Sequence, residues 1–268
     1  ICIQIFCVIK FRDLFKYAKD LNADALVTGH YVGRNQINGK ANMYRAKDYH
    51  RDQSYFLFST SQEQLDYLRF PLGKIEKLET RNIALKLNLN VADKPDSQDI
   101  CFVPNGDYSS VIKKFRPESF KAGDILDTSG NKLGEHEGII NYTIGQRKGI
   151  KIANAEALYV VKINASTNTI IVGPKKFLFI KNIKLKNLNI LGEKKEFKKI
   201  IKIKVRSTGK LLDAKFRFFE NQGKVELLED ETGVSPGQAC VFYSKDCYGD
   251  KVLGGGWIYE TENKFLST

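Results

Sequence analysis

The sequence contains little that could build a disulfide framework, a metal site or a membrane span. Its five cysteines form no Cys-x-x-Cys pair, so neither a tetrahedral zinc site nor a regular set of disulfides is indicated. No apolar run approaches the roughly 20 residues that span a bilayer, and the short apolar start lacks a basic leader and a small-residue cleavage site. These absences predict a soluble, cytoplasmic protein with reduced thiols and with no metal or membrane partner.

Positive charge is concentrated in one stretch of the chain. The net charge is +12, and residues 175–217 hold 15 Lys or Arg against 3 Asp or Glu, so this stretch accounts for the whole excess. Such a confined basic segment favours a polyanionic partner, with nucleic acid ahead of a membrane because no amphipathic helix accompanies it. A lysine-rich surface that is merely solvated is the alternative.

The N-terminal part has the pattern of an α/β repeat. Apolar residues recur at helical spacing from Phe11 to Leu21, and residues 25–27 form a short apolar strand. Gly29 and His30 follow that strand, at the position where open parallel sheets place their ligands. This predicts a binding role for His30, and a purely structural histidine is the alternative.

Two further helices and two β-rich segments are predicted. Thr60 and Glu63 have the spacing of a capping box, for a helix that ends before Pro71, and another helix is expected over 81–87. Short apolar runs at 123–126, 158–163 and 168–172 indicate strands. Residues 201–206 and 214–218 alternate apolar with basic side chains, which predicts strands with one core face and one basic face, and 221–223 are expected to form a turn.

These patterns predict an α/β plus β fold in three domains. Residues 1–110 would form the α/β domain, 111–182 a small central β-rich domain, and 183–268 a C-terminal β-barrel or sandwich. The chain is long enough for this division, because its 268 residues are 42% hydrophobic and 11% aromatic.

Among the cysteines, Cys101 has the sequence surroundings most typical of a reactive thiol. It lies in Asp96-Ser97-Gln98-Asp99-Ile100-Cys101-Phe102-Val103-Pro104, where polar side chains can form a hydrogen-bonded loop beside it. A small buried hydrophobe is the alternative. Cys240 lies in an apolar strand-like run and is predicted to be core, and Cys247 is predicted to be a loop thiol.

Several motifs together resemble the tRNA-specific 2-thiouridylases. The segment Lys94–Phe102 is similar to their persulfide-carrying segment, and the resemblance extends over essentially the whole chain. The other matching stretches are Thr28-Gly29-His30-Tyr31, Asp52-Gln53-Ser54-Tyr55-Phe56-Leu57, Tyr142-Thr143-Ile144-Gly145-Gln146-Arg147-Lys148-Gly149 and Ser235-Pro236-Gly237-Gln238.

The resemblance implies a fold and a reaction. The fold would be an adenine-nucleotide alpha-hydrolase-like (PP-loop) catalytic domain, a small central domain and a C-terminal β-barrel that faces tRNA. The family uses ATP, with magnesium, to adenylate the C2 oxygen of a wobble uridine before a persulfide attacks. The sulfur would come from a donor partner, either a sulfur-relay protein or a cysteine desulfurase.

The resemblance also implies residue roles. Cys101 would carry the persulfide, and a second cysteine would release the sulfur by forming a disulfide. Cys7 is the candidate, although the family's cysteine aligns with Ile5. Gly29 would approach ATP and His30 the target base. Further tRNA contacts are implied for the triplet Arg51-Asp52-Gln53, for Lys204 and Arg206 in a basic region, and for Gln238, for which a simple turn residue is the alternative.

One family feature is missing from the sequence. Family members carry a Ser-Gly-Gly-x-Asp-Ser phosphate loop near the N-terminus, and this chain, which starts at Ile1, contains neither that loop nor Gly-x-x-x-x-Gly-Lys-Ser/Thr. We therefore expect a truncated enzyme: a fragment, a split gene with a separately encoded N-terminal segment, or a decayed gene. A tRNA-binding remnant without catalysis is the competing interpretation.

Overall fold

A computed structural model describes residues 12–92, 117–220 and 222–263 of the chain. The chain divides into two compact units: the first comprises 1–96, 184–228 and 237–259, and the second 97–183, 229–236 and 260–268. Cys7, Cys101 and the predicted domain boundary at residue 110 lie outside the described residues. The division into 1–110, 111–182 and 183–268 stays a prediction.

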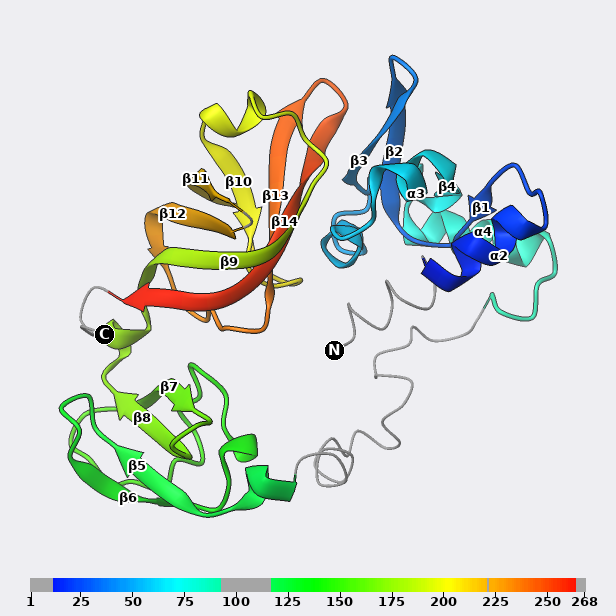
Figure 1. The fold of residues 1–268 in the computed structure, drawn as a ribbon. Helices are drawn as coiled ribbons and strands as arrows, with labels where there is room; N and C mark the ends of the chain where they lie inside the picture. The colour runs from blue at the N-terminus through cyan, green and yellow to red at the C-terminus, as the bar shows by residue number, and fades with distance from the viewer. Residues whose placement is uncertain (1–11, 93–116, 221, 264–268) are drawn as a thin grey trace. The chain divides into compact units, whose positions relative to one another are not determined.

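The N-terminal segment of the first unit has the predicted α/β character (Figure 1). Helix α2 (Leu14–Asp20) lies within the predicted helix. It leads to strand β1 (Leu26–Val27), which pairs in parallel with β4 (Leu68–Arg69). The other elements of this segment are β2 (Val32–Ile37), β3 (Lys40–Arg45), η2 (Ser54–Leu57), α3 (Gln62–Tyr67), η3 (Pro71–Lys74) and α4 (Lys77–Lys86).

The capping prediction for α3 was wrong by one residue. The cap is Ser61, whose hydroxyl accepts a hydrogen bond from the Gln64 N–H at 3.2 Å while the Gln64 side chain accepts from the Ser61 N–H at 2.9 Å. Thr60 is 1% exposed and its hydroxyl has no hydrogen-bond partner among the described residues. Because the Thr60 side chain is buried in the core, Ser61 rather than Thr60 caps helix α3. Helix α4 also begins earlier than predicted, at Lys77 rather than Arg81.

The second unit contains a small β-sheet with its own core. Its four strands follow the order β6-β5-β8-β7. Strands β5, β7 and β8 confirm the three apolar runs that the sequence indicated, whereas β6 was not predicted. Ile125 of β5 and Ile170 and Val172 of β8 are fully buried. The strands are β5 (Gly123–Leu126), β6 (Lys132–His136), β7 (Tyr159–Asn164) and β8 (Thr169–Gly173), with short helices η5 (Pro117–Phe120), η6 (Ile139–Asn141) and η7 (Lys175–Leu178).

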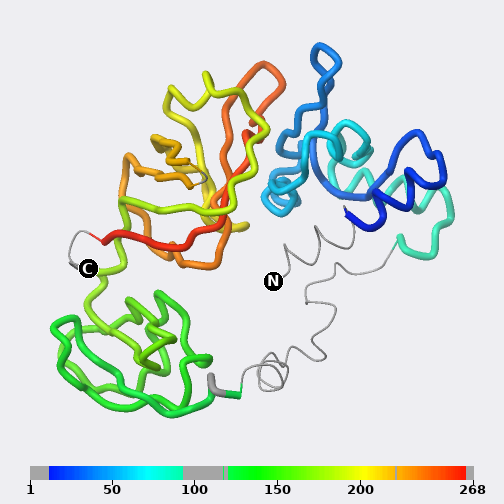
Figure 2. Tube along the Cα trace, in the orientation of Figure 1, coloured from blue at the N-terminus to red at the C-terminus, as the bar shows by residue number. Residues whose placement is uncertain are grey.

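The C-terminal strands close into a barrel, which confirms the barrel prediction. Six strands follow one another in the order β13-β10-β11-β12-β9-β14, and β13 pairs with β14 to complete the ring. Figure 2 shows β9 and β14 running alongside each other as neighbouring strands of the barrel wall. The elements are β9 (Ile180–Ile190), η8 (Glu196–Lys198), β10 (Ile201–Lys204), β11 (Leu212–Phe219), β12 (Gln222–Glu231), β13 (Ala239–Asp246) and β14 (Gly249–Asn263).

The β11–β12 hairpin differs from the predicted turn. Gln222 pairs with Phe219 and Gly223 with Phe218, so both residues belong to strand β12 rather than to the turn. Gly223 is required at its position, because a Cβ there would lie 2.4 Å from Cε2 of Phe216. The glycine therefore marks a close approach of strand and ring instead of a reversal of the chain.

The N-terminal segment and the barrel share one core within the first unit. Strand β3 pairs with β14 at Tyr44 and Lys251. Buried residues of the N-terminal segment, among them Met43 and Phe58, belong to the same apolar cluster as Val241 and Tyr243 of the barrel. Residues 31–70 are thereby held against the barrel wall by burial of apolar surface.

No helix in the described part of the chain is long and apolar enough to cross a membrane.

Candidate functional site

The loop after β1 exposes Gly29 and buries His30. A Cβ at Gly29 would meet only Cδ1 of Leu72, at 3.8 Å, so the space beside its backbone is open. His30 is 8% exposed, and its Nδ1 lies 2.9 Å from the hydroxyl oxygen of Thr28. This contact fixes the imidazole ring within the loop. The binding roles of Gly29 and His30 stay predictions.

Gln53 joins this loop to the predicted Arg51-Asp52-Gln53 contact segment. The Gln53 N–H donates to the carbonyl of Tyr31 at 2.9 Å, and the Gln53 side-chain oxygen accepts from the Tyr31 N–H at 2.9 Å. This reciprocal pair places residues 51–53 directly beside the loop that carries His30. Arg51 is exposed, so its guanidinium reaches the surface at this place.

Asp52 is the centre of a buried polar network. Its carboxylate is 1% exposed and accepts from Nε of Arg45 at 3.1 Å, from the Ala46 N–H at 3.1 Å and from the Ser54 hydroxyl at 3.0 Å. Arg45 also donates to Asp250 of β14 at 3.1 Å. The observed contacts of Asp52 are thus within the protein, where it orders residues 45–54 and links them to the barrel.

Tyr243 and Tyr55 extend this network into strand β13. The hydroxyls of Ser54 and Tyr243 are 3.2 Å apart, and the Tyr55 hydroxyl donates to the carbonyl of Ala239 at 2.9 Å. Burial raises the pKa of both tyrosines, so both stay protonated donors at neutral pH. Sequence reasoning missed Tyr243 and Asp250, because their partners Ser54 and Arg45 lie far away along the chain. It also missed Arg45, which no local pattern identifies although its partner Asp52 is near in sequence.

Lys204 differs from the prediction of an exposed basic strand face. It is 5% exposed at the end of β10, where it pairs with Val241 of β13. Burial lowers its pKa, Asp52 acts in the opposite direction, and Arg45 lowers it further. Lys204 therefore belongs to the buried network rather than to the surface. Its predicted neighbour in tRNA binding, Arg206, is half-buried beyond the strand.

Gln238 lies in an exposed turn next to the same network. The turn requires Gly237, which has a φ of +85°, a conformation that favours glycine. The backbone of the turn is fixed to β14, because the Gly237 N–H donates to the Ile258 carbonyl and the Ile258 N–H donates to the Gln238 carbonyl, both at 2.8 Å. Since Tyr55 contacts Ala239, the turn is anchored beside residues 53–55.

The structure thus assembles several predicted residues from distant parts of the sequence. The His30 loop contacts Gln53, Asp52 is electrostatically coupled to Lys204, and Tyr55 contacts the residue after Gln238. Chain segments near 30, 52, 204 and 238 therefore meet in the first unit. The structure supplies no distance from these residues to Cys101 or Cys7, which lie outside the described residues.

Two other cysteines are described. Cys240 is fully buried, and burial raises its pKa, which confirms its assignment to the core. Cys247 is exposed, as predicted for a loop thiol. A buried thiol with a raised pKa is a poor nucleophile, so Cys240 is excluded as the sulfur carrier.

The described helices do not fit the phosphates of a nucleotide. A phosphate site at a helix N-terminus combines free N–H groups with the positive end of the helix dipole. Helices α2, α3 and α4 each have a carboxylate there, from Asp13, Glu63 and Glu76 respectively, which would repel phosphate. The backbone beside Gly29, the residue that the resemblance places near ATP, is open.

Comparison with known proteins identifies three consecutive family matches. Residues 2–105 match the tRNA methyl transferase HUP domain, 109–174 the tRNA methyl transferase PRC-barrel domain, and 180–258 the aminomethyltransferase beta-barrel domain. These matches confirm the predicted fold class of a PP-loop-like α/β domain, a small central domain and a C-terminal β-barrel.

Individual relatives match over almost the entire chain. A tRNA-specific 2-thiouridylase MnmA of Dinoroseobacter shibae is 52% identical over 264 residues, which cover 96% of this chain and 68% of the relative. Proteins of the same name from Jannaschia sp. and Rickettsia africae are 49% and 50% identical, over 97% and 96% of this chain and 69% and 70% of their own lengths.

Proposed function

The chain belongs to the tRNA-specific 2-thiouridylase family, and on that premise we propose that it serves to replace the C2 oxygen of the wobble uridine in tRNA with sulfur. The observation that carries the proposal is the similarity to the 2-thiouridylases over 96–97% of the chain. The segment around Cys101, with its acidic and amide side chains, lies within that match.

Cys101 is the proposed sulfur carrier. Its persulfide would supply the sulfur that bonds to C2, while the C2–O bond breaks. A second thiolate would attack Sγ of Cys101, so that the transferred sulfur leaves and a disulfide remains, and Cys7 is the candidate for this role. ATP, with magnesium, would make the uridine oxygen a better leaving group. The described helix N-termini do not fit its phosphates, so we assign no described residue to that step beyond Gly29.

The tRNA would dock where the segments near 30, 52, 204 and 238 meet. His30, Arg51, Gln53, Arg206 and Gln238 are the proposed contacts. Asp52 and Lys204 have a different proposed part: their burial supports a role in holding the docking residues in place, since a side chain that is 1% or 5% exposed offers little surface to RNA.

The proposed sulfur source is a donor protein, either a cysteine desulfurase or a sulfur-relay protein. A second candidate function is tRNA binding without catalysis. The observation that favours it is the carboxylate at the N-terminus of each described α-helix, because the activation of uridine needs a phosphate-binding site.

The proposal is tested by following sulfur onto Cys101. Residues 1–268 are incubated with a cysteine desulfurase and cysteine, and the digested protein is analysed by mass spectrometry. We expect one added sulfur atom on the Cys101 peptide, lost in Cys101→Ser and retained in Cys247→Ser, a control that removes an exposed thiol. Sulfur on Cys247 alone, with Cys101 unmodified, would overturn the assignment of the carrier.

Mass spectrometry of tRNA nucleosides separates the two candidate functions. We expect ATP-dependent 2-thiouridine only when the N-terminal part of a longer relative is added as a second chain, because the described helices do not fit the phosphates. Formation by residues 1–268 alone would contradict that expectation. Salt-dependent tRNA binding without 2-thiouridine under either condition would favour the non-catalytic function.

A further inference from the structure

A basic cavity lies on the barrel between the η8 segment and strand β11. We call it the basic groove and define it by Lys194, Lys198, Lys199, Lys215, Arg217 and Phe218, which line a space of about 520 Å³. None of these residues belongs to the predicted tRNA contacts. The groove lies in the first unit and is part of the stretch that carries the whole positive excess of the chain.

The five cations of the groove have no carboxylate partner among the described residues, and the acids of the same stretch are paired elsewhere. Glu193 pairs with Lys195 at 2.7 Å, Glu196 with Lys251 at 3.2 Å and Asp213 with Lys202 at 2.7 Å. Glu226 stands opposite Lys215 in the β11–β12 ladder, without an ion pair between them in the described part of the chain. The positive charge of the groove is therefore not neutralised internally.

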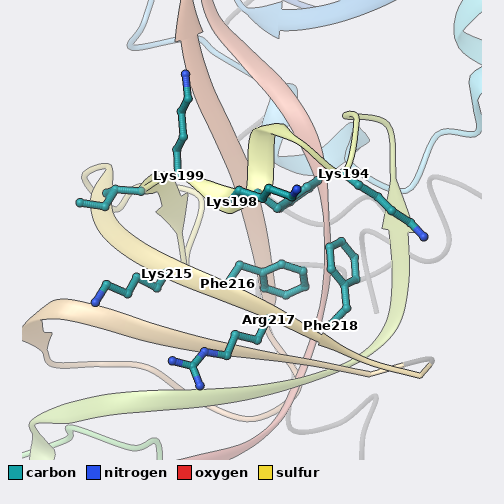
Figure 3. A pocket seen from close by; sticks show the side chains of 9 residues that line it. Lys194, Lys198, Lys199, Lys215, Phe216, Arg217 and Phe218 are labelled. Atoms are coloured by element: carbon teal, nitrogen blue, oxygen red, sulfur yellow. The ribbon is translucent and has the colours of Figure 1, made fainter.

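An aromatic cluster forms the floor of the groove and fixes one exposed ring. Phe218 is 40% exposed, and its ring centroid lies 4.6 Å from that of Phe216 and 5.2 Å from that of Phe197. Figure 3 shows the rings of Phe216 and Phe218 on one side of β11 and the ends of Lys215 and Arg217 on the other. The ring that faces solvent is therefore preorganised by the two phenylalanines behind it.

This combination fits RNA better than an acidic protein. Lysine ammonium groups are compact point charges that suit phosphates, and a fixed, partly exposed aromatic ring offers a stacking surface to an unpaired base. Protein interfaces, by contrast, are depleted in lysine, whereas four of the five cations here are lysines. We propose that the basic groove binds the tRNA backbone through these cations and stacks an unpaired base on Phe218.

The inference rests on the proposed function, since its ligand is the tRNA substrate. The first test measures binding of residues 1–268 to an unmodified tRNA transcript by fluorescence anisotropy over a salt series. The variant Lys198→Gln, Lys199→Gln, Lys215→Gln and Arg217→Gln should lower the slope of log affinity against log salt by about 3, as expected for four phosphate contacts. A matched variant changes four exposed lysines outside the groove to Gln, at positions 16, 86, 121 and 245, and should keep the slope.

The second test addresses stacking. Phe218→Leu keeps apolar volume in the cluster but removes the flat ring, and should weaken tRNA binding by roughly 5- to 150-fold, the range that loss of one stacked base implies, with the salt slope unchanged. Phe219→Leu is the matched control, because Phe219 is 54% exposed and does not line the groove. The unfolding midpoints of all variants show whether a loss of tRNA binding reflects a loss of folding. The variant with Lys198, Lys199, Lys215 and Arg217 changed to Gln tests the groove without altering the aromatic cluster.

The outcomes separate the inference from the proposed function. If the unaltered chain shows no salt-dependent tRNA binding, the proposed function fails. If it binds but the groove variant keeps both its affinity and its slope, only the groove is excluded. Binding of the unaltered chain and of the groove variant to poly-glutamate is measured in parallel. If the groove variant loses as much affinity for poly-glutamate as for tRNA, the groove is a surface for acidic proteins and the assignment to RNA is overturned.

Discussion

Two neighbouring barrel strands carry the same alternation of apolar and basic residues but use their basic residues differently. In β10, Lys202 pairs with Asp213 and Lys204 is buried beside Asp52. In β11, Lys215 and Arg217 are exposed and have no ion pair among the described residues. Alternation therefore identifies the core face of each strand, whereas the use of the opposite face depends on what covers it.

The two regions also differ in what a charge does there. The buried network around Asp52 orients segments of the protein toward one another, and removal of one member leaves a desolvated partner. The basic groove keeps its charges in water, where they add little to stability and remain available to an anion. Substitutions in the first region should act on stability and substitutions in the second on binding.

The largest expected effect breaks the buried network. Asp52→Ala removes the carboxylate that Arg45 and Ser54 contact, and should lower the free energy of unfolding by about 3–5 kcal/mol, because Arg45 loses one of its two carboxylates and the Ala46 N–H and Ser54 hydroxyl lose their buried acceptor. Asp52→Asn keeps the shape and one acceptor, and should cost less. Urea unfolding of residues 1–268 measures both variants, and a loss below about 1 kcal/mol for Asp52→Ala would mean that the network does not hold the segments together.

An intermediate effect is expected beneath the groove. Gly223→Ala places a Cβ 2.4 Å from Cε2 of Phe216, so the ring must move, and we expect a loss of about 1–3 kcal/mol in the free energy of unfolding. The matched control is Gly29→Ala, whose Cβ would meet only Leu72 at 3.8 Å and should change stability by less than about 0.5 kcal/mol. Equal urea midpoints for the two variants would show that the Phe216 ring can move without lowering the free energy of unfolding.

The smallest effect is a difference in pH dependence. The pKa of Lys204 is lowered by burial, so at pH values between its folded pKa and the unfolded value of about 10.4 the unfolded chain binds a proton that the folded chain does not. Stability attributable to Lys204 therefore rises with pH in that window. The difference in the free energy of unfolding between the unaltered chain and Lys204→Met should change in favour of the unaltered chain as the pH rises toward 10. A difference that stays constant with pH would contradict the lowered pKa of Lys204.

Local sequence patterns predicted helices and strands well where each element buries one apolar face. The α2 helix, three strands of the second unit and the core faces of β10 and β11 followed from apolar periodicity, because helices and strands bury their apolar residues at fixed spacing. Periodicity left barrel and sandwich open, and strand β6 was not predicted. The capping error at Thr60 arose because Thr60 and Ser61 can both cap, and only the burial of Thr60 decided between them. Gly223 was predicted as a turn residue, since no local signal reveals that Phe216 packs over it.

By itself, the sequence determined the family, the fold class, the confinement of positive charge to residues 175–217 and the core position of Cys240, because each depends on residue types and their spacing along the chain. Only the tertiary structure decided which of those charges are neutralised. The pairs Glu196–Lys251 and Arg45–Asp250 join distant segments, and Arg45–Asp250 spans most of the chain. Such pairs form only when burial of a shared core brings the segments together. Within the described part of the chain, that packing brings no carboxylate into an ion pair with the cations of the groove.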